Sequence, residues 1–269
     1  MVIDMDGSIS IGEIKNRLKT ISDCGIMEYD SEIKALEDFI REYESDSRSG
    51  VMSTVKSASK KLDFLKKEIL RVKDMTRFEK ENAPKYKYIC GVDEVGRGPL
   101  AGPIVTAAVI LPQDTLIPYL NDSKQLSEKR REELFDIINE VAVSVSIGIR
   151  SEKEIDDNGI AVMDSAAMRD SVLGLEPKAD LVLVDAFKIP DLDIPQIPII
   201  KGDTLSVSIA AASIVAKVTR DRMMDEYASI YPEYGFDSNK GYGSAKHIEA
   251  IKTIGPCDIH RRSFIKNFV

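Results

Sequence analysis

The sequence predicts an α/β fold, with a mixed sheet flanked by helices, preceded by a small all-helical domain. Residues 1–85 carry apolar residues at helical spacing, whereas strand-like apolar runs begin at Tyr88 and then alternate with helical patterns. A polar stretch that contains Pro84 separates the two parts. We therefore predict a helical extension at residues 1–82 and an α/β domain at residues 86–269.

Length and composition are those of an ordinary globular protein. The 269 residues suffice for one large domain, or for a medium domain plus a smaller one. No apolar run is long enough to span a membrane and the N-terminus has no secretory pattern, so we expect a cytoplasmic protein without a membrane partner. The three cysteines are scattered, as expected in a reducing compartment, and two histidines are too few for a multi-histidine metal site.

Charge is unevenly distributed along the chain, although the net charge is −8. Residues 1–46 hold twelve acids and five bases, a net charge of −7, and residues 47–85 hold eleven bases and five acids, a net charge of +6. The last thirty residues hold six bases and two acids. Any nucleic-acid contact should therefore be local, which suits an enzyme that must release its substrate.

Three helices are predicted in the extension. Ser10 and Glu13 form a capping pattern ahead of the first apolar stripe, and a second helix follows Asp30. From Val51 to Val72 the apolar positions alternate at spacings of four and three, which is a heptad seam. We favour packing of this seam on the first two helices over a dimeric coiled coil, and we expect a monomer. The lysines of this segment either contact phosphates or form a solvated face; they are Lys56, Lys60, Lys61, Lys66, Lys67 and Lys73.

Strands and helices alternate in the second part. Ser127 caps one helix, and Ser151 with Glu154 begins another, because a serine hydroxyl accepts a hydrogen bond from the free amides of a first helical turn. The strand-like segments are 88–93, 104–111, 141–150, 181–184 and 197–200, and the helical segments are 127–139, 159–173, 205–228 and 244–254.

Four carboxylates stand at the ends of these elements. Asp93 and Glu94 follow the first strand, Asp185 follows the apolar run 181–184, and Asp203 precedes the long helix. Side chains of a regular strand alternate between its faces, so Asp93 and Glu94 should converge only if the strand frays or bends at the glycines that follow. Each acid alone has an ordinary interpretation, and Asp203 could simply cap its helix. Together, oxygen ligands without cysteine or histidine favour hard cations such as Mg²⁺ or Mn²⁺.

Six segments carry a family resemblance: VDEVGRGPLAGP, NDSKQLS, LVLVDAF, KGDTLSVSIAAASIVAKVTRD, NKGYGSAKH and GPCDIHRRSF. In this order they resemble bacterial ribonuclease HII, over essentially all of residues 86–269. The first 85 residues resemble the helical extension of some Gram-positive members. The resemblance implies a ribonuclease H-like fold, cleavage of the RNA strand of RNA–DNA hybrids, and incision 5′ of a single ribonucleotide in duplex DNA.

The resemblance also assigns roles to the acids. It makes Asp93, Glu94, Asp185 and Asp203 the catalytic residues and the ligands of Mg²⁺ or Mn²⁺. Two such ions, about 4 Å apart, suit phosphodiester cleavage because they stabilise both the attacking and the leaving oxygen. The products would carry 5′-phosphate and 3′-hydroxyl ends.

Ribose recognition is assigned to a glycine-rich loop and a tyrosine. Gly96, Arg97 and Gly98 match the family loop that approaches the 2′-hydroxyl, the group that distinguishes RNA from DNA. Tyr242 matches the family tyrosine that packs near the junction between ribonucleotide and DNA. From the residues alone, Tyr242 could equally be a surface aromatic in a turn.

Further substrate contacts each have two interpretations. Ser123 and Lys124 suit a phosphate, or they belong to a plain turn before the Ser127 cap. Lys217 and Arg220 lie three residues apart on one helix face, and they could hold the DNA strand or form a solvated stripe.

The C-terminal motif has an open role. Arg261 and Arg262 either bind phosphate or tie the tail to the core. His247 and His260 have no predicted role as catalytic bases.

Two other functions compete with the nuclease hypothesis. One is the sister activity that needs several consecutive ribonucleotides, against which the intact Gly-Arg-Gly loop and Tyr242 argue. The other is a non-catalytic binder of hybrids or DNA, which would gain nothing from four acids that face phosphates. We expect RNA–DNA hybrids and DNA duplexes that contain ribonucleotides as the partners.

Overall fold

The computed structural model describes residues 9–269, which form two compact units. One unit comprises the chain up to Asp74 together with Leu116–Tyr119, and the other comprises Met75–Thr115 and Leu120–Val269. The first eight residues of the predicted extension lie outside the described residues. Residues 75–82 belong to the unit that holds the sheet, so the compact units divide earlier in the chain than the predicted domains 1–82 and 86–269, which stay a prediction.

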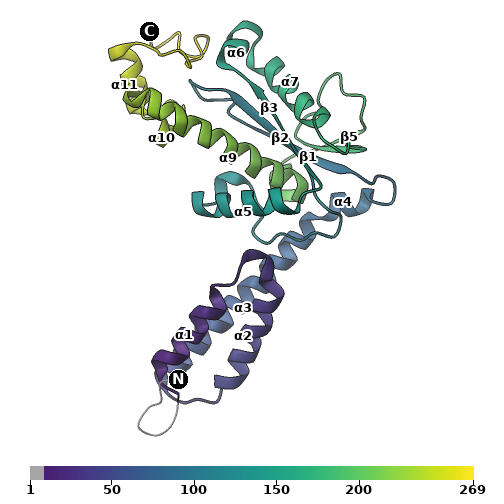
Figure 1. The fold of residues 1–269 in the computed structure, drawn as a ribbon, viewed down its shortest axis with the longest axis vertical. Helices are drawn as coiled ribbons and strands as arrows, with labels where there is room; N and C mark the ends of the chain where they lie inside the picture. The colour runs from purple at the N-terminus through teal and green to yellow at the C-terminus, as the bar shows by residue number, and fades with distance from the viewer. Residues whose placement is uncertain (1–8) are drawn as a thin grey trace. The chain divides into compact units, whose positions relative to one another are not determined.

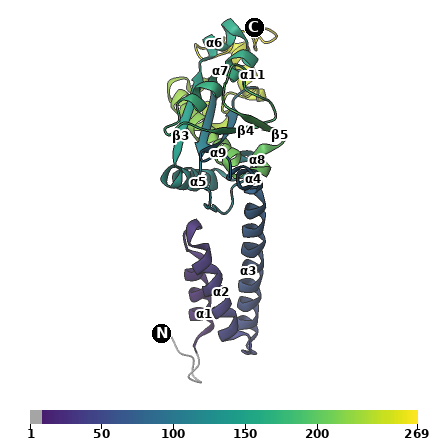
Figure 2. The same ribbon diagram turned by 90° about the vertical axis from the view of Figure 1, so that its right-hand side faces the viewer.

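The first unit is built from three helices, which lie side by side in Figures 1 and 2. They are α1 (Ile11–Ser22), α2 (Tyr29–Tyr43) and α3 (Ser49–Met75), with the short 3₁₀ helix η1 (Ile26–Glu28) between the first two. Ser10 caps α1 by accepting a hydrogen bond from Glu13 N–H at 3.2 Å. Buried residues one heptad apart on α3, Val51, Ala58 and Leu65, share a core with the first two helices, as the seam predicts.

Part of the lysine face of α3 is engaged within this unit. Lys61 lies 2.5 Å from Glu32, and Lys66 lies 2.6 Å from Glu37. These two ammonium groups therefore have partners of opposite charge, with which a phosphate would have to compete.

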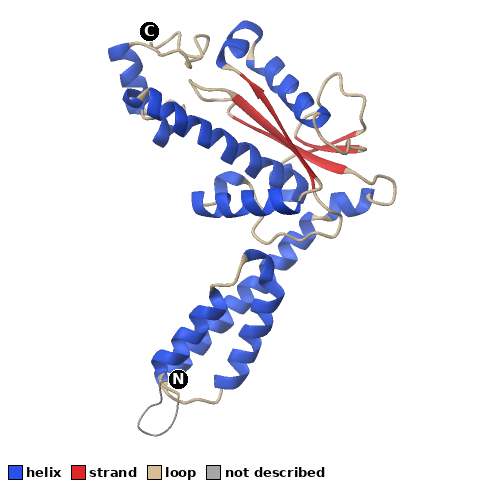
Figure 3. Cartoon of the chain, viewed as in Figure 1, coloured by secondary structure: helices blue, strands red, loops and turns tan. Residues whose placement is uncertain are grey.

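The second unit is organised around a mixed five-stranded sheet of order β3-β2-β1-β4-β5 (Figures 1 and 3). The strands are β1 (Ile89–Val95), β2 (Ile104–Ile110), β3 (Ser144–Arg150), β4 (Leu181–Asp185) and β5 (Gln196–Ile199). Strand β2 runs antiparallel to both β1 and β3, whereas β4 runs parallel to both β1 and β5. Strand β1 is therefore the central strand, with the antiparallel β2 on one side and the parallel β4 on the other.

Helices cover both faces of this sheet, with α7 and α9 on opposite sides in Figure 1. Cys90 and Val92 of β1 pack in one core with Met168 of α7, while Ile89 packs in another core with Ile209 of α9. None of the helices between residues 9 and 269 combines the length and the apolar character that a membrane crossing requires. The helices of this unit are α4 (Arg77–Asn82), α5 (Glu128–Val141), α6 (Glu152–Asn158), α7 (Ile160–Leu173), α8 (Gly202–Leu205), α9 (Val207–Ile230), α10 (Phe236–Asn239) and α11 (Ala245–Ile254), with 3₁₀ helices η2 (Ser123–Gln125) and η3 (Pro232–Tyr234).

The long helix predicted from residue 205 is broken at its start. Ser206 is extended, with φ −128° and ψ 130°, and it separates the single turn α8 from α9. Its hydroxyl accepts a hydrogen bond from Ile209 N–H at 3.3 Å and so serves as the N-cap of α9. The alanine-rich pattern predicts the helix but not this cap, which places Asp203 on a separate turn.

The start of α9 lies directly against β1 at Gly91. A Cβ atom at Gly91 would lie 2.1 Å from the Ser208 carbonyl carbon, which is backbone and cannot rotate away. We therefore predict that Gly91→Ala lowers the free energy of unfolding by about 1–3 kcal/mol or more, measured by urea denaturation. Gly12→Ala in α1, whose Cβ would have its nearest neighbour at 3.9 Å, serves as the control and should not destabilise. Equal stability of the two variants would contradict the close approach.

Candidate active site

The two adjacent acids lie on a strand that stays regular. Strand β1 pairs with β2 through Glu94 and Val95, so it neither frays nor bends at the acids, and the condition for both side chains to converge on one face is not met. Residues 90 and 92 face α7 and residue 89 faces α9, so Asp93 projects on the α9 side and Glu94 on the α7 side. The two carboxyl groups still interact, because the charge of Glu94 raises the pKa of Asp93.

Asp185 occupies the position beside these acids where β4 ends. Its neighbour Val184 pairs with Val92, so Asp185 and Asp93 follow paired residues on adjacent parallel strands. The next residue, Ala186, has φ 59°, which turns the chain away from the sheet. Asp185 Oδ1 accepts a hydrogen bond from Gly202 N–H at 2.7 Å, which joins this strand end to α8.

The charge of Asp185 reaches the other three predicted acids. Burial and the charge of Glu94, with a further contribution from Asp185, raise the pKa of Asp93 well above its usual range. Burial and Asp185 also raise the pKa of Glu94. Burial, Asp122 and Asp185 raise the pKa of Asp203. The fold therefore brings the four predicted acids into one electrostatic cluster, from three separate elements.

Two serines support Asp93. Asp93 is 7% exposed, and a hydrogen bond from Ser213 of α9 holds its pKa lower than burial alone would. Ser213 Oγ lies 3.0 Å from Ser123 Oγ, and Ser123 is itself buried. The phosphate contact predicted for Ser123 is therefore not seen in this structure, since its hydroxyl faces Ser213 and not solvent. We assign Ser123 to the support of Asp93.

Lys124 remains an exposed cation beside the acids. Although burial opposes it, the charges of Asp122, Asp93 and Asp203 raise the pKa of Lys124. Asp122 also caps η2 by accepting a hydrogen bond from Lys124 N–H at 2.9 Å. The two interpretations of this loop are thus compatible, because the turn itself presents the lysine next to the acids.

A cavity of about 280 Å³ opens on the α7 side, lined by Glu94, Arg97, Asp164 and Asp185 among others. Asp164 of α7 was not among the predicted site residues. Its Oδ2 lies 3.2 Å from Arg97 Nε, and its Oδ1 is buried without a hydrogen-bond partner among the described residues. Burial and the charge of Glu94 raise the pKa of Asp164 to about 7, against the opposing charge of Arg97. The helical spacing could have indicated that Asp164 faces inward, because it lies four residues before the buried Met168 on an apolar helix face.

The loop after β1 brings the predicted recognition residues together. Gly96 has φ 100°, and a Cβ there would lie 2.4 Å from Arg220 Nε, so both its conformation and its space require glycine. A Cβ at Gly98 would lie 3.9 Å from Cε1 of Tyr242, which places the tyrosine ring beside this glycine. Tyr242 is 43% exposed. Arg97, between the glycines, lies 3.9 Å from Glu94.

Arg261 holds this loop in place through hydrogen bonds to its backbone. Its guanidinium is fully buried and donates to the carbonyl oxygens of Gly96, Arg97 and Gly102 at 2.6, 3.1 and 2.9 Å. Of the two roles considered for this arginine, the structure selects the tie between the tail and the core. The neighbouring His260 pairs with His247 through their Nε2 atoms at 3.0 Å, inside the core.

Arg220 has a similar structural role, which corrects the predicted contact with DNA. It is fully buried and donates to the carbonyl oxygens of Pro103, Lys240 and Ala101. Helix spacing showed that it shares a face with Lys217 but not that this face is turned inward. Lys217 is partly buried and bonds to Asp221 Oδ1 at 2.7 Å, so a phosphate would have to compete with that carboxylate.

The acids are clustered but are not arranged as a finished metal site. Within residues 9–269, no set of three or more His, Cys, Asp or Glu side chains is placed so that it could hold a metal ion. The donor chemistry nevertheless suits a hard cation, because all four predicted ligands are carboxylates and three have raised pKa values. In the cavity that Glu94 and Asp185 line, Asp164 Oδ1 adds a buried carboxylate oxygen that has no hydrogen-bond partner within residues 9–269.

Two family models match the chain. The model for Ribonuclease HII matches residues 90–267, and the model for the Ribonuclease HII N-terminal domain matches residues 10–83. Together they cover nearly the whole chain, and the gap between them includes Pro84.

Individual relatives agree with these matches. A ribonuclease HII from Lachnoclostridium phytofermentans is 50% identical over 260 residues, covering 97% of this chain and 98% of the relative. One from Acetivibrio thermocellus is 54% identical over 215 residues, covering 80% of this chain and 84% of the relative. The crystal structure of ribonuclease H2 from Pyrococcus horikoshii matches with a TM-score of 0.57 and 26% identity, covering 67% of this chain and 96% of that one. The predicted ribonuclease H-like fold and helical N-terminal domain are confirmed.

Proposed function

The chain belongs to the ribonuclease HII family and is therefore a ribonuclease H, and from this premise we propose that it incises DNA duplexes 5′ of single embedded ribonucleotides as well as RNA–DNA hybrids. We propose Mg²⁺ or Mn²⁺ as its cofactor. Its location in the cytoplasm and its monomeric state stay predictions from the sequence.

One observation carries this proposal: the acid cluster and the recognition loop form one continuous structure. Glu94 of β1 is separated from Gly96 only by Val95, and Gly98 of the same loop lies beside Tyr242. A ribonucleotide whose 2′-hydroxyl is read by this loop would thus have its phosphodiester next to the carboxylates. Because Tyr242 lies beside Gly98 of this loop, the loop and the tyrosine together are placed to read one ribose.

The residues that would hold the metal are Asp93, Glu94, Asp185 and Asp203. Their mutual repulsion and burial raise three of the four pKa values, and a dication would relieve that repulsion. Bound there, the ions would supply electrostatic stabilisation to an in-line phosphodiester displacement that leaves 5′-phosphate and 3′-hydroxyl ends.

The protein itself supplies orientation and positive charge. Lys124 is exposed beside Asp93 and Asp203, where its ammonium group can bind a substrate phosphate. Asp164 and Glu94 flank Arg97, which holds the guanidinium next to the loop glycines. Arg261 keeps the loop carbonyls from turning, so the loop backbone is ordered before substrate arrives.

Tyr242 provides a test of ribose recognition. We predict that Tyr242→Ala lowers the rate of incision at a single ribonucleotide by about 10–100-fold, because the ring that packs beside Gly98 is lost. Tyr242→Phe keeps the ring and should retain most of that rate. Cleavage of a uniform RNA–DNA hybrid should suffer less, and equal losses on both substrates would remove the ribose role of Tyr242.

The hydrolase activity itself is tested with a labelled RNA–DNA hybrid. We expect cleavage in Mg²⁺ or Mn²⁺ and none in EDTA, with products that a ligase can join because they carry 5′-phosphate and 3′-hydroxyl ends. Cleavage that persists in EDTA would contradict the metal assignment.

A further inference from the structure

The carboxylate of Glu79 lies buried at the start of α9. Glu79, on α4, is 8% exposed. Its Oε1 accepts hydrogen bonds from the hydroxyls of Ser206 and Ser208 at 2.5 and 2.7 Å, and from Ser208 N–H at 3.1 Å. Ser206 in turn accepts from Ile209 N–H as the N-cap of α9. Glu79 therefore extends this cap with a second oxygen, supplied by a different helix.

The start of α9 presents partial positive charge to Glu79 Oε1. Helix α9 has 24 residues, and its first N–H groups and its dipole present partial positive charge to a carboxylate at this end. On the other side, the same helix start is pressed against β1, because a Cβ at Gly91 would lie 2.1 Å from the Ser208 backbone. The junction between α8 and α9 is thus held between Glu79 and the strand that carries Asp93.

This junction carries the fourth acid of the site. Asp203 lies on the single turn α8, three residues before Ser206. One end of the turn is joined to Asp185 through Gly202 N–H, and the other end closes through Ser206 N–H, which donates to the Gly202 carbonyl at 2.8 Å. A four-residue turn has little stability of its own. Its placement therefore depends on what holds Ser206, and Glu79 is a principal contact there.

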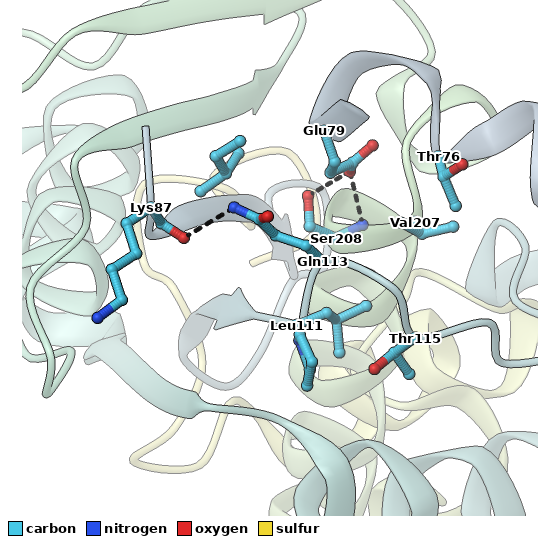
Figure 4. A pocket seen from close by; sticks show the side chains of 10 residues that line it. Thr76, Glu79, Lys87, Leu111, Gln113, Thr115, Val207 and Ser208 are labelled. Atoms are coloured by element: carbon cyan, nitrogen blue, oxygen red, sulfur yellow. Dashed lines mark hydrogen bonds between the residues drawn. The ribbon is translucent and has the colours of Figure 1, made fainter. Parts of the chain in front are cut away.

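The cavity next to Glu79 does not suggest a ligand. Figure 4 shows Glu79 and Ser208 at its wall, opposite Gln113 and Leu111. Its volume is about 20 Å³. That is room for about one water molecule, and far too little for a nucleotide. The hydrogen bonds of Glu79 consequently serve the helix junction.

We propose that Glu79 is a positioning residue for Asp203: it fixes Ser206 and so holds the α8 turn in the place where Asp203 joins the other acids. The segment matched by the N-terminal family model includes α4, so the last helix of that segment would serve the catalytic site directly. This inference rests on the proposed function, since Asp203 is given its role there.

Kinetics of the full chain test the proposal. Glu79→Ala leaves the serine donors without their acceptor, and it should lower kcat for hybrid cleavage by about 10–100-fold with KM nearly unchanged. Glu79→Asp keeps the charge but withdraws the oxygen by one methylene, and it should also lower kcat. Glu79→Gln retains an Oε1 acceptor and should restore most of the activity. Glu81→Ala, an exposed acid on the same helix, is the control and should match the wild type.

Hydrogen exchange of the metal-free protein gives a readout that does not depend on activity. The amides of residues 204–209 should exchange faster in Glu79→Ala and Glu79→Asp than in Glu81→Ala or Glu79→Gln. The proposal is overturned if these amides are equally protected in all four variants, or if folded Glu79→Asp retains the wild-type kcat. If the wild-type protein cleaved no substrate, the proposed function would be wrong. The hydrogen-exchange result would still show whether Glu79 positions the junction between α8 and α9.

Discussion

Replacing Asp93 by asparagine should abolish cleavage while leaving substrate binding intact. The amide has the size of the carboxylate and keeps an oxygen to accept the hydrogen bond from Glu94 N–H, which measures 2.8 Å in the wild type. What it removes is the negative charge that would hold a metal at the centre of the acid cluster. We expect kcat to fall by at least about 10²–10³-fold, as when one electrostatic contact to a transition state is removed. Cleavage of a labelled hybrid and fluorescence anisotropy of the same hybrid measure the two properties.

The matched control for this variant is Asp157→Asn. Asp157 is exposed on α6, so the same chemical change there should alter neither cleavage nor binding. Because burial raises the pKa of Asp93, the neutral amide should fold at least as stably as the wild type. Retained cleavage in Asp93→Asn would remove this residue from the metal site.

Replacing Arg261 by alanine should be the most damaging change outside the acid cluster. The substitution leaves the carbonyl oxygens of Gly96, Arg97 and Gly102 without their donor in a buried position. An unsatisfied buried polar group costs about 1–3 kcal/mol, so we expect a loss of about 3 kcal/mol or more in the free energy of unfolding. Urea denaturation followed by circular dichroism measures this loss.

The adjacent Arg262 provides the control for that experiment. Arg262 is exposed, and its side chain makes long contacts of 3.4 Å to the carbonyls of Pro256 and Cys257. Arg262→Ala should therefore change stability by no more than about 0.5 kcal/mol. If the two alanine variants were equally stable, the loop would not depend on Arg261.

Features set by neighbouring residues could be predicted from the sequence. Ser10, Ser127, Ser151 and Ser244 each cap the helix that follows them, because a serine cap needs only the next three residues. The apolar run 181–184 likewise forms a strand that ends on Asp185. The positions of the acids at the ends of elements could be predicted for the same reason.

Features set by distant segments could not be predicted. In the sequence, Arg220 shares a helix face with Lys217 and Arg261 lies in a basic C-terminal motif, so a phosphate contact is one interpretation of each. Their actual partners are carbonyl oxygens up to 165 residues away in the chain, which only the folded arrangement brings close. The regular course of β1 has a similar origin, because pairing with β2 continues through Val95. Asp185 joins Asp93 and Glu94 because β4 ends beside them.

The most direct test uses a labelled DNA duplex that carries one ribonucleotide, incubated with the purified protein and Mg²⁺ or Mn²⁺. If the loop beside the acid cluster reads one ribose, as we propose, the duplex is cut once on the 5′ side of the ribonucleotide, and EDTA or Asp93→Asn abolishes this incision. An intact duplex under conditions in which a long RNA–DNA hybrid is cut would contradict recognition of a single ribose by Gly96, Arg97, Gly98 and Tyr242.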